Sequence, residues 1–508
     1  MKIRKILYYL GRILLAGAVI MLLPVIVSLI YRDGCAVAFI VSSAGVGVLG
    51  AAFLFVNRKK VGSLSSKEGM AVAALTWIIL SVFGALPSVI SGAVGSFTDA
   101  FFDTVSGYST TGATVLPSMD ALPHSILFWR SLTHWVGGLG ILAFAIAVLP
   151  KDKSASDTFA VKAETPGPTF GKLVSKLKFN SQILYLIYLG LTVVEFVLLL
   201  CGGMPVFDGV CNSLATMGSG GFAMRDSGIA GYNSAYIEWV IAVFMMFAGI
   251  NFNFYYFLII RKFSKAFSIE EVRWYIGIIV VAVAVIATNI YSIYESIGDS
   301  VRHAFFQVCT VMSTTGFATA DFNMWPGFSK MILVLLMFIG GCAGSTGGGM
   351  KVSRIVVLFK TGFKEIRHYM NPREVSAIHF DKQSLDRSVI TGISSYFVVF
   401  MLAYAASILV VSLDGHDFTT SVTAVTSCMN NIGPGLSEVG PMSNYACMST
   451  LSKYVLSFDM LLGRLELFPM LVLFSPRAWK KKDLYRYMCE NPLFTKRGFS
   501  CSPSKTFE

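Results

Sequence analysis

The sequence has little charge for its length. Only 14% of its 508 residues are Asp, Glu, Lys or Arg, whereas a soluble protein carries about a quarter. Eight nearly uncharged runs of about 20 residues or more are each long enough to cross the hydrocarbon core of a bilayer as a helix. They lie near residues 6–31, 35–57, 70–92, 125–149, 183–203, 235–260, 275–297 and 388–413. The scarcity of charge therefore excludes a set of soluble domains and predicts an all-α integral membrane protein.

Several kinds of catalytic and binding pattern are also missing. The chain has six His and contains neither HExxH nor GxSxG, so the clustered groups that an intramembrane enzyme needs are not apparent. Its nine Cys are scattered without metal-like spacing, which predicts packing residues and no disulfide framework. We therefore expect neither an enzyme nor a covalently bound cofactor.

The net charge of +12 is concentrated in a few places. Of the 41 Lys and Arg, 33 fall in six segments between apolar runs, a distribution that favours a membrane protein with lipid contacts over a nucleic-acid-binding one. If the six segments share one side, the positive-inside rule makes that side cytoplasmic. This predicts a multi-pass protein whose termini are both cytoplasmic. The segments are 1–5, 58–67, 151–182, 261–273, 351–387 and 477–508.

The apolar runs between these basic segments group into hairpins. The first hairpin is a plain pair of helices. Each of the next four has an apolar helix, a stretch of about 10–15 residues that is too short to span, a bend and another apolar helix. Such short stretches suit re-entrant half-helices, which are tolerated only inside protein or beside water. The predicted units are an N-terminal hairpin, four pore repeats and a cytoplasmic tail, with bounds 1–60, 61–150, 151–265, 266–375, 376–476 and 477–508.

The four bends can be laid over one another. They read YSTTGATVL (108–116), TMGSGGFAM (216–224), MSTTGFATA (312–320) and MNNIGPGLS (429–437). Aligned on one glycine each, they are anchored by Gly112, Gly220, Gly316 and Gly433. A single Thr-Gly bend is explained as well by an ordinary loop or by helix packing. Four in matching context form an internal repeat.

The composition of the bends favours a pore for cations. An ion that crosses a membrane must exchange its water shell for other oxygens, and converging backbone carbonyls can supply them. Glycine permits the dihedrals that point successive carbonyls inward, and a half-helix ending at the bend directs its negative end at the ion. The predicted pore has four pseudo-symmetric helix–pore helix–helix repeats around one axis. Its predicted ion-binding residues are Thr111, Gly112, Ser219, Gly220, Thr315, Gly316, Ile432 and Gly433.

These motifs resemble those of the bacterial TrkH/KtrB potassium-uptake family. The bends TTGAT, SGGFA, STTGFAT and NIGPG carry the resemblance, together with HWVGGLGI (134–141) and GSTGGGMKVSR (344–354). The additional N-terminal hairpin makes the chain similar to the TrkH branch. The resemblance implies K⁺ uptake across a bacterial inner membrane by a homodimer with one pore per protomer. It also implies a cytosolic TrkA-like regulatory ring, which would bind the nucleotide (ATP/ADP or NAD) in place of this chain.

The bends depart from a uniform pattern in two repeats. Gly-Ser precedes Gly220 in the second, and Asn-Ile precedes Gly433 in the fourth, which removes a hydroxyl. Each repeat offers one such glycine, so we expect a short filter, which leaves Na⁺ open as a second permeant ion. An ion-coupled potassium symporter is the alternative function, since such transporters also use broken helices.

The stretch GGCAGSTGGGMK (340–351) interrupts an apolar helix of the third repeat. It is not a phosphate-binding loop, because Met350 separates Gly349 from Lys351 and no strand precedes it. An interruption at this depth must line a cavity. We expect a mobile loop beneath the filter that closes the pore. The predicted gate residues of this loop are Gly340, Gly341, Gly344, Ser345, Thr346, Gly347, Gly348 and Gly349.

Arg464 lies near the middle of a last predicted helix at about 446–475. A charge at that depth is unfavourable unless it is paired or faces water. An ion pair with Glu466 or Asp459 is one explanation. The resemblance implies the other, in which Arg464 lies beside the glycine-rich loop and holds the gate.

Overall fold

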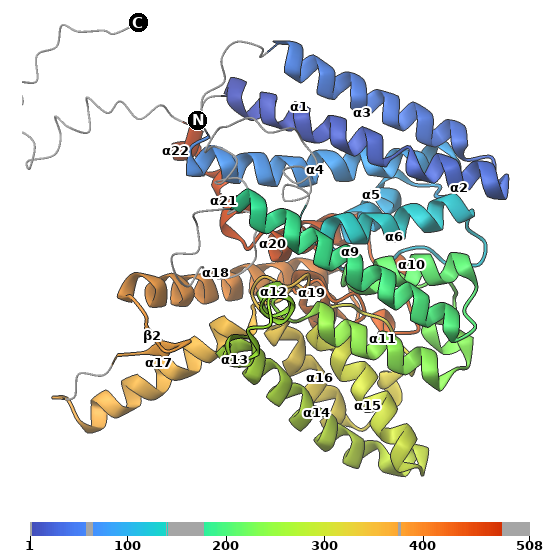
Figure 1. Cartoon of the computed structure of the whole chain (residues 1–508). Helices are drawn as coiled ribbons and strands as arrows, with labels where there is room; N and C mark the ends of the chain where they lie inside the picture. Colours follow the sequence, from blue (N-terminus) through green and yellow to red (C-terminus); the bar gives the residue numbers. More distant parts are fainter. Residues whose placement is uncertain (1–2, 57–63, 139, 141–176, 374–376, 480–508) are drawn as a thin grey trace, which may run out of the picture.

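The computed structural model describes residues 3–56, 64–138, 140, 177–373 and 377–479, which are mostly helical (Figure 1). Within these ranges six helices are long and apolar enough to cross a membrane, and a bent pair forms one further broken span. The predicted all-α membrane architecture is confirmed. The predicted loop 151–182 and tail 477–508 lie almost wholly outside the described residues.

The N-terminal hairpin packs against the first repeat. Its helices α1 and α2 form one span with a short turn before Pro24, and α3 returns beside them. Gly11 of α1 faces Gly50 of α3, where an added Cβ at Gly50 would lie 3.0 Å from the Gly11 carbonyl oxygen. Small residues allow this close approach of two membrane helices. The bounds are α1 Ile3–Ile20, α2 Leu23–Tyr31 and α3 Ala36–Val56.

Four repeats follow, each built from a long helix, a short pore helix and a further helix. The first comprises α4 Ser66–Ile90, α5 Phe97–Tyr108 and α6 His124–Gly138. The second comprises α9 Leu177–Cys201, α10 Val206–Met217, α11 Ala235–Ala248 and α12 Phe252–Ile259. The third comprises α14 Glu270–Tyr294, α15 Ile297–Met312, α16 Gly327–Ile339 and α17 Val352–Met370. The fourth comprises α18 Arg387–Val411, α19 Phe418–Met429, α20 Thr450–Arg464 and α21 Phe468–Phe474.

Short elements connect these helices. They are α13 Phe263–Phe267, α22 Pro476–Trp479, the antiparallel pair β1 His379–Phe380 and β2 Gln383–Ser384, and the 3₁₀ turns η1 Gly228–Tyr232, η2 Phe322–Met324, η3 Ser412–Asp414, η4 Ser437–Val439 and η5 Tyr445–Cys447. Helix α17 and the β1–β2 pair extend away from the rest of the molecule (Figure 1).

Local sequence sets where several of these helices begin. Helix α4 starts with a capping box, in which Ser65 N–H donates to Glu68 at 2.9 Å and Glu68 N–H donates to the Ser65 hydroxyl at 3.4 Å. Asp417 caps α19 through the Thr420 N–H at 3.2 Å. These caps satisfy amides that have no partner within the helix.

The packing of the pore helices is cyclic. Each of α5, α10, α15 and α19 packs against helices of its own repeat and against one helix of the preceding repeat in the ring. The cross-repeat pairs are α5 with α20, α10 with α6, α15 with α11 and α19 with α16. Because the first repeat contacts the fourth in this series, the four repeats close around one axis, as predicted.

In three repeats the helix that follows the pore helix and its bend is broken. Two of these breaks were not predicted. Helices α11 and α12 meet at 96° around residues 249–251, although one span was expected at 235–260. The last predicted helix is also wrong, because α20 ends at Arg464. Glu466 and Leu467 then adopt φ of 58° and 59° before α21 begins. The predicted break in the third repeat is confirmed and occupies residues 340–351, between α16 and α17.

Candidate functional site: a four-stranded ring and the loop beside it

All four pore helices end in the same way. The residue after each C-cap is left-handed, with φ between 55° and 57°, although none of the four is glycine. The next N–H donates to the carbonyl five residues earlier, at 2.8–2.9 Å, which closes a Schellman motif. The motif turns the chain sharply at the negative end of each helix dipole. The left-handed residues are Thr110, Ser219, Thr314 and Asn431, and the donors are Thr111, Gly220, Thr315 and Ile432.

A glycine with φ between 76° and 102° follows each motif. An added Cβ at Gly112 would overlap the carbonyl oxygen of Gly220 in the next repeat, and Gly221 stands in the same relation to Thr315. Gly316 likewise faces the Ile432 carbonyl. Gly433 completes the series, since its added Cβ would lie 2.7 Å from the Thr111 carbonyl oxygen. Four carbonyls and four glycines therefore alternate around a closed ring. A side chain at any of these glycines would collide with a carbonyl oxygen of the ring.

The ring corrects the alignment of the second repeat by one residue. Gly221, and not Gly220, matches Gly112, because both have positive φ and both face a carbonyl of the next repeat. Gly220 instead matches Thr111 as a carbonyl residue. Its lack of a side chain has a local cause, since an added Cβ would overlap the ring of His134. His134 is fully buried in α6, with Nδ1 2.8 Å from the Gly107 carbonyl oxygen.

Side-chain oxygens and amides stabilise the four chain segments that form the ring, which we call the ring strands although they are not β-strands. Ser109 and Thr111 share a hydrogen bond of 2.7 Å, and Ser313 and Thr315 share an equivalent one, also of 2.7 Å. The fourth repeat has the apolar Ile432 at this position, but Asn431 donates across to the Thr111 hydroxyl at 3.0 Å. The hydroxyl missing from the fourth bend is therefore offset by an amide that links the fourth repeat to the first.

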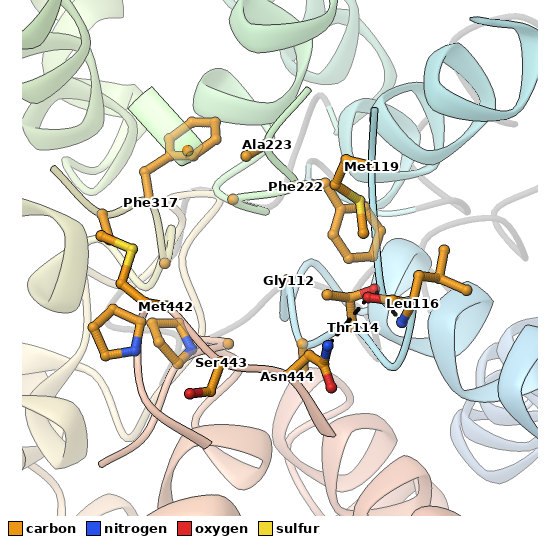
Figure 2. Close-up of a pocket in the computed structure, with 18 of the residues that line it drawn as sticks. Gly112, Thr114, Leu116, Met119, Phe222, Ala223, Phe317, Met442, Ser443 and Asn444 are labelled. Atoms are coloured by element: carbon orange, nitrogen blue, oxygen red, sulfur yellow. Dashed lines mark hydrogen bonds between the residues drawn. The ribbon is translucent and has the colours of Figure 1, made fainter. Parts of the chain in front are cut away.

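A cavity of about 270 Å³ opens on one side of the ring. Residues that directly follow the ring glycines line it, and Figure 2 shows Thr114, Phe222 and Phe317 around it from three repeats, with Asn444 from the fourth. We call this space the vestibule. The exposed Asp226 carboxylate at the vestibule accepts a hydrogen bond of 2.7 Å from Ser118, and this bond lowers the pKa of Asp226. An ionised carboxylate here raises the local concentration of cations.

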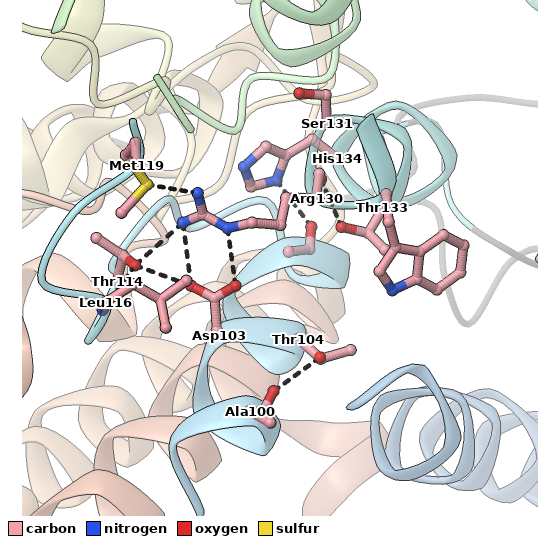
Figure 3. Close-up of polar contacts among 12 residues, drawn as sticks. Ala100, Asp103, Thr104, Thr114, Leu116, Met119, Arg130, Ser131, Thr133 and His134 are labelled. Atoms are coloured by element: carbon pink, nitrogen blue, oxygen red, sulfur yellow. Dashed lines mark hydrogen bonds and ion pairs between the residues drawn. The ribbon is translucent and has the colours of Figure 1, made fainter. Parts of the chain in front are cut away.

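A buried ion pair supports the first strand beside the vestibule (Figure 3). Arg130 of α6 donates to both carboxylate oxygens of Asp103 in α5, at 2.9 and 3.1 Å. Thr114 joins the pair by donating to Asp103 at 2.9 Å and accepting from Arg130 at 3.0 Å. The guanidinium also lies 3.8 Å from the centroid of Phe222. The pair holds the ring strand after Gly112 in place. Its pairing and its additional hydrogen bonds offset the free energy lost when the two charges are removed from water.

The loop of residues 340–351 lies on the other side of the ring and touches three of its strands. Gly348 N–H donates to the Thr314 hydroxyl at 2.6 Å, and Thr346 shares a hydrogen bond of 2.6 Å with Ser219. An added Cβ at Gly348 would lie 2.7 Å from the Asn430 carbonyl oxygen, and one at Gly347 would lie 2.7 Å from that of Ser313. The loop therefore abuts the left-handed residues that begin the strands.

The rest of the loop is tied to the helices around it. Cys342 N–H donates to the Gly249 carbonyl at 2.9 Å, and Gly344 accepts from Phe252 N–H at 3.1 Å, so Gly344 and Gly341 lie against the break between α11 and α12. Ser345 donates to the Cys342 carbonyl at 2.7 Å. Gly340 and Gly349 have φ of 71° and 76° and lie against each other where the loop leaves α16. The eight predicted gate residues of the loop thus lie in one compact segment, and all of them except Gly344 are buried.

Arg464 joins this loop to the first repeat. Its guanidinium donates to the Thr346 carbonyl at 2.6 Å and to the carbonyls of Gly137 and Gly138 at the end of α6. Of the two acids proposed as alternative partners, Glu466 pairs with Arg354 at 2.5 Å, and Asp459 accepts a hydrogen bond from Ser407 at 2.7 Å. The described contacts of Arg464 therefore match its expected place beside the loop.

Further charges surround the loop and were not predicted to contribute to the site. Lys351 is buried and donates to the Gly347 carbonyl. Glu271 of α14 accepts from the N–H groups of Ala343 and Ser353 at 2.7 and 3.1 Å. Lys351, Arg354 and Arg464 thus bring positive charge close to the loop. Asp103 and Arg130 were also missed, and a charged residue within each short apolar segment was the signal that could have identified them.

Comparisons with known proteins agree with this architecture. The family model described as TrkH, a cation transport protein, matches residues 38–481. The Trk system potassium uptake protein TrkH of Salmonella typhimurium is 36% identical and covers 95% of this chain and 100% of its own length. The TrkH protein of Halomonas elongata is 34% identical, with the same coverage of both chains. The crystal structure of the potassium transporter TrkH from Vibrio parahaemolyticus superposes with a TM-score of 0.85 at 34% identity, over 94% of this chain and 100% of that one.

Proposed function

Since the chain belongs to the TrkH family of cation transport proteins, we propose that it takes up K⁺ across a bacterial inner membrane through a pore within the single chain. The observation that carries this proposal is the closed ring, in which carbonyls of Thr111, Gly220, Thr315 and Ile432 alternate with four positive-φ glycines. Fixed carbonyl oxygens can replace the water shell of a monovalent cation. The four helix ends that point at the ring add favourable partial charges.

The proposed filter is short, and this bears on selectivity. Each repeat contributes one positive-φ glycine and one carbonyl to the ring. We expect K⁺ to be preferred and Na⁺ to pass at a lower rate, because a single ring supplies few oxygens in series. The proposed ion-binding residues are Thr111, Gly112, Gly220, Gly221, Thr315, Gly316, Ile432 and Gly433, with Ser219 acting through its bond to the loop.

We further propose that residues 340–349 form the gate and that Arg464 holds it closed. The loop lies directly against Thr314 and Asn431 below the ring, where it obstructs an ion leaving the filter. Arg464 stabilises that position through the Thr346 carbonyl and adds positive charge along the path of a cation. Movement of the loop away from the ring would open the pore.

Orientation and partners follow from charge and exposure. We propose that both termini are cytoplasmic, because the basic segments then share the cytoplasmic side; the vestibule is then external. Helix α17 projects from the body and exposes Phe359, Phe363, Ile366 and Tyr369, which supports a homodimer formed there. A cytosolic TrkA-like ring would carry the regulatory nucleotide and act on the loop through α17.

Ion flux in vesicles tests the proposed function against the ion-coupled alternative. We expect purified protein in sealed vesicles to pass K⁺ down its gradient when the Na⁺ and H⁺ gradients are both set to zero. A K⁺ ionophore added to protein-free vesicles gives the reference signal. A flux that appears only when a Na⁺ or H⁺ gradient is imposed would identify a symporter and contradict the open-pore proposal.

A further inference from the structure

Three side chains with metal-binding atoms meet on the vestibule side of the fourth repeat. His416 precedes α19, Glu438 lies in η4, and Cys447 ends η5. Their imidazole nitrogen, carboxylate oxygen and sulfur atoms all lie within 4.8 Å of one another. His416 Nδ1 is 2.7 Å from the Glu438 carboxylate. Three separate segments thus bring one nitrogen, one oxygen and one sulfur donor together, outside the ring and the loop.

We propose that His416, Glu438 and Cys447 form a binding site for a soft divalent cation, with Zn²⁺ as the best fit, and that the bound ion lowers the flux through the pore. Zn²⁺ takes nitrogen, sulfur and carboxylate ligands in tetrahedral geometry. Its bond lengths place neighbouring ligand atoms roughly 3.3–3.8 Å apart, so the present spacing needs only small side-chain rotations. A water molecule would complete the fourth position, and the Cys447 thiol would release its proton to solvent.

The accessibility of the three groups suits an external ion. Cys447 is exposed, the Glu438 side chain is 50% exposed and His416 is 15% exposed. The backbone around them is nevertheless fixed, because Glu438 N–H donates to the Thr420 hydroxyl at 3.3 Å. The site therefore combines an open approach with ligands held on short, bonded turns. Hard cations such as K⁺ do not favour a thiolate, which separates this site from the transported ion.

The elements that carry the ligands also hold the ring. Tyr445, two residues before Cys447, donates from its hydroxyl to the Gly433 carbonyl at 2.7 Å, and its N–H donates to the Thr114 carbonyl at 2.8 Å. Val439, next to Glu438, lines the vestibule. A bound Zn²⁺ would cross-link these turns and restrain the strand at Gly433. It would also neutralise Glu438 and place positive charge near the mouth, which lowers the local concentration of cations. This effect on flux rests on the proposed function, whereas the binding does not.

Titration of the purified, untagged protein with Zn²⁺ tests the binding directly. Every sample carries Cys489→Ser and Cys501→Ser, which removes the two tail thiols, and is reduced and freed of metal beforehand. We expect one Zn²⁺ per chain, and an affinity at least about ten-fold weaker in Cys447→Ser and His416→Ala. Cys201→Ser removes the other exposed thiol among the described residues and should leave the affinity unchanged. Equal affinity in the parent and Cys447→Ser, or no saturable binding by the parent, would overturn the site.

A second readout identifies the ligand and the consequence. With Co²⁺ in place of Zn²⁺, the parent should show a thiolate-to-cobalt absorption band that Cys447→Ser lacks. External Zn²⁺ at about the dissociation constant of the parent should reduce K⁺ flux in vesicles of the parent and have little effect on Cys447→Ser. Binding that depends on Cys447 without a change in flux would overturn the coupling to the pore. Parent vesicles that carry no K⁺ at all would contradict the proposed function, while the titration would still establish or reject the metal site.

Discussion

Replacing Gly316 by serine is expected to abolish discrimination between K⁺ and Na⁺ and to lower K⁺ flux by more than about ten-fold. Gly316 has φ of 90°, and an added Cβ would overlap the Ile432 carbonyl oxygen. A side chain in such a conformation costs of order 1–3 kcal/mol, and every 1.4 kcal/mol corresponds to a factor of about ten. The strand must therefore shift and take a ring oxygen with it.

The measurement compares K⁺ and Na⁺ flux in vesicles for the parent and Gly316→Ser. Gly277→Ser serves as the matched control, because Gly277 of α14 is exposed and has open space where a Cβ would be added. Both variants are first compared with the parent for yield and thermal unfolding in detergent. Unchanged flux together with unchanged selectivity in well-folded Gly316→Ser would mean that the ring is not the filter.

Replacing Arg464 by alanine is expected to raise K⁺ flux by roughly ten-fold with selectivity preserved. The guanidinium holds Thr346 of the loop and the end of α6 through three carbonyls. A hydrogen bond to a charged group contributes about 1.5–3 kcal/mol. Its loss should therefore raise the ratio of open to closed loop by about ten-fold or more. The ring glycines and carbonyls are not altered by the change.

Two further variants separate the loss of the gate from general damage. Arg464→Lys keeps the charge but cannot reach several carbonyls at once, so its flux should lie between those of the parent and Arg464→Ala. Alanine at Gly347, Gly348 and Gly349 together should also raise flux, because the added methyl groups would press the loop away from Ser313 and Asn430. A change in selectivity with gating unaffected would refute the assignment of the loop.

The sequence was most informative where a simple physical limit applied. Long uncharged runs predicted α3, α4, α9, α14 and α18, because only a helix satisfies the backbone inside a bilayer. The shortness of the segments before each bend predicted the pore helices. The many glycines at residues 340–351 identified the break there, because glycine is strongly unfavourable inside a helix.

The other breaks lacked such a signal. Between α11 and α12 the chain reads AGINF, with Gly249 and Asn251, and after α20 it reads LELFP, with Glu466 and Pro469. Each break therefore carries only isolated signals within a mostly apolar run. The bend at residues 249–251 is set by tertiary contacts, among them the bond from Cys342 to the Gly249 carbonyl. The hydrophobic pattern of one segment carries no information about a contact with Cys342, about 90 residues further along the chain.

The predicted alignment of the second bend was wrong by one residue for a related reason. Gly218, Gly220 and Gly221 stand close together, so several alignments place a glycine at the anchor. Only the position of His134 shows why Gly220 lacks a side chain and why Gly221 is the ring glycine. His134 is buried and packs against the ring strand itself.

Locating a heavy analogue of K⁺ tests the central claim most directly. The protein would be crystallised in Rb⁺ in place of K⁺ and the anomalous signal of Rb⁺ mapped. We predict a peak on the axis of the ring, among the carbonyl oxygens of Thr111, Gly220, Thr315 and Ile432, with no comparable peak between the loop and α20. A strongest peak away from these four carbonyls, or a ring without Rb⁺ in crystals that hold it elsewhere, would contradict the assignment of the ring as the ion-binding filter.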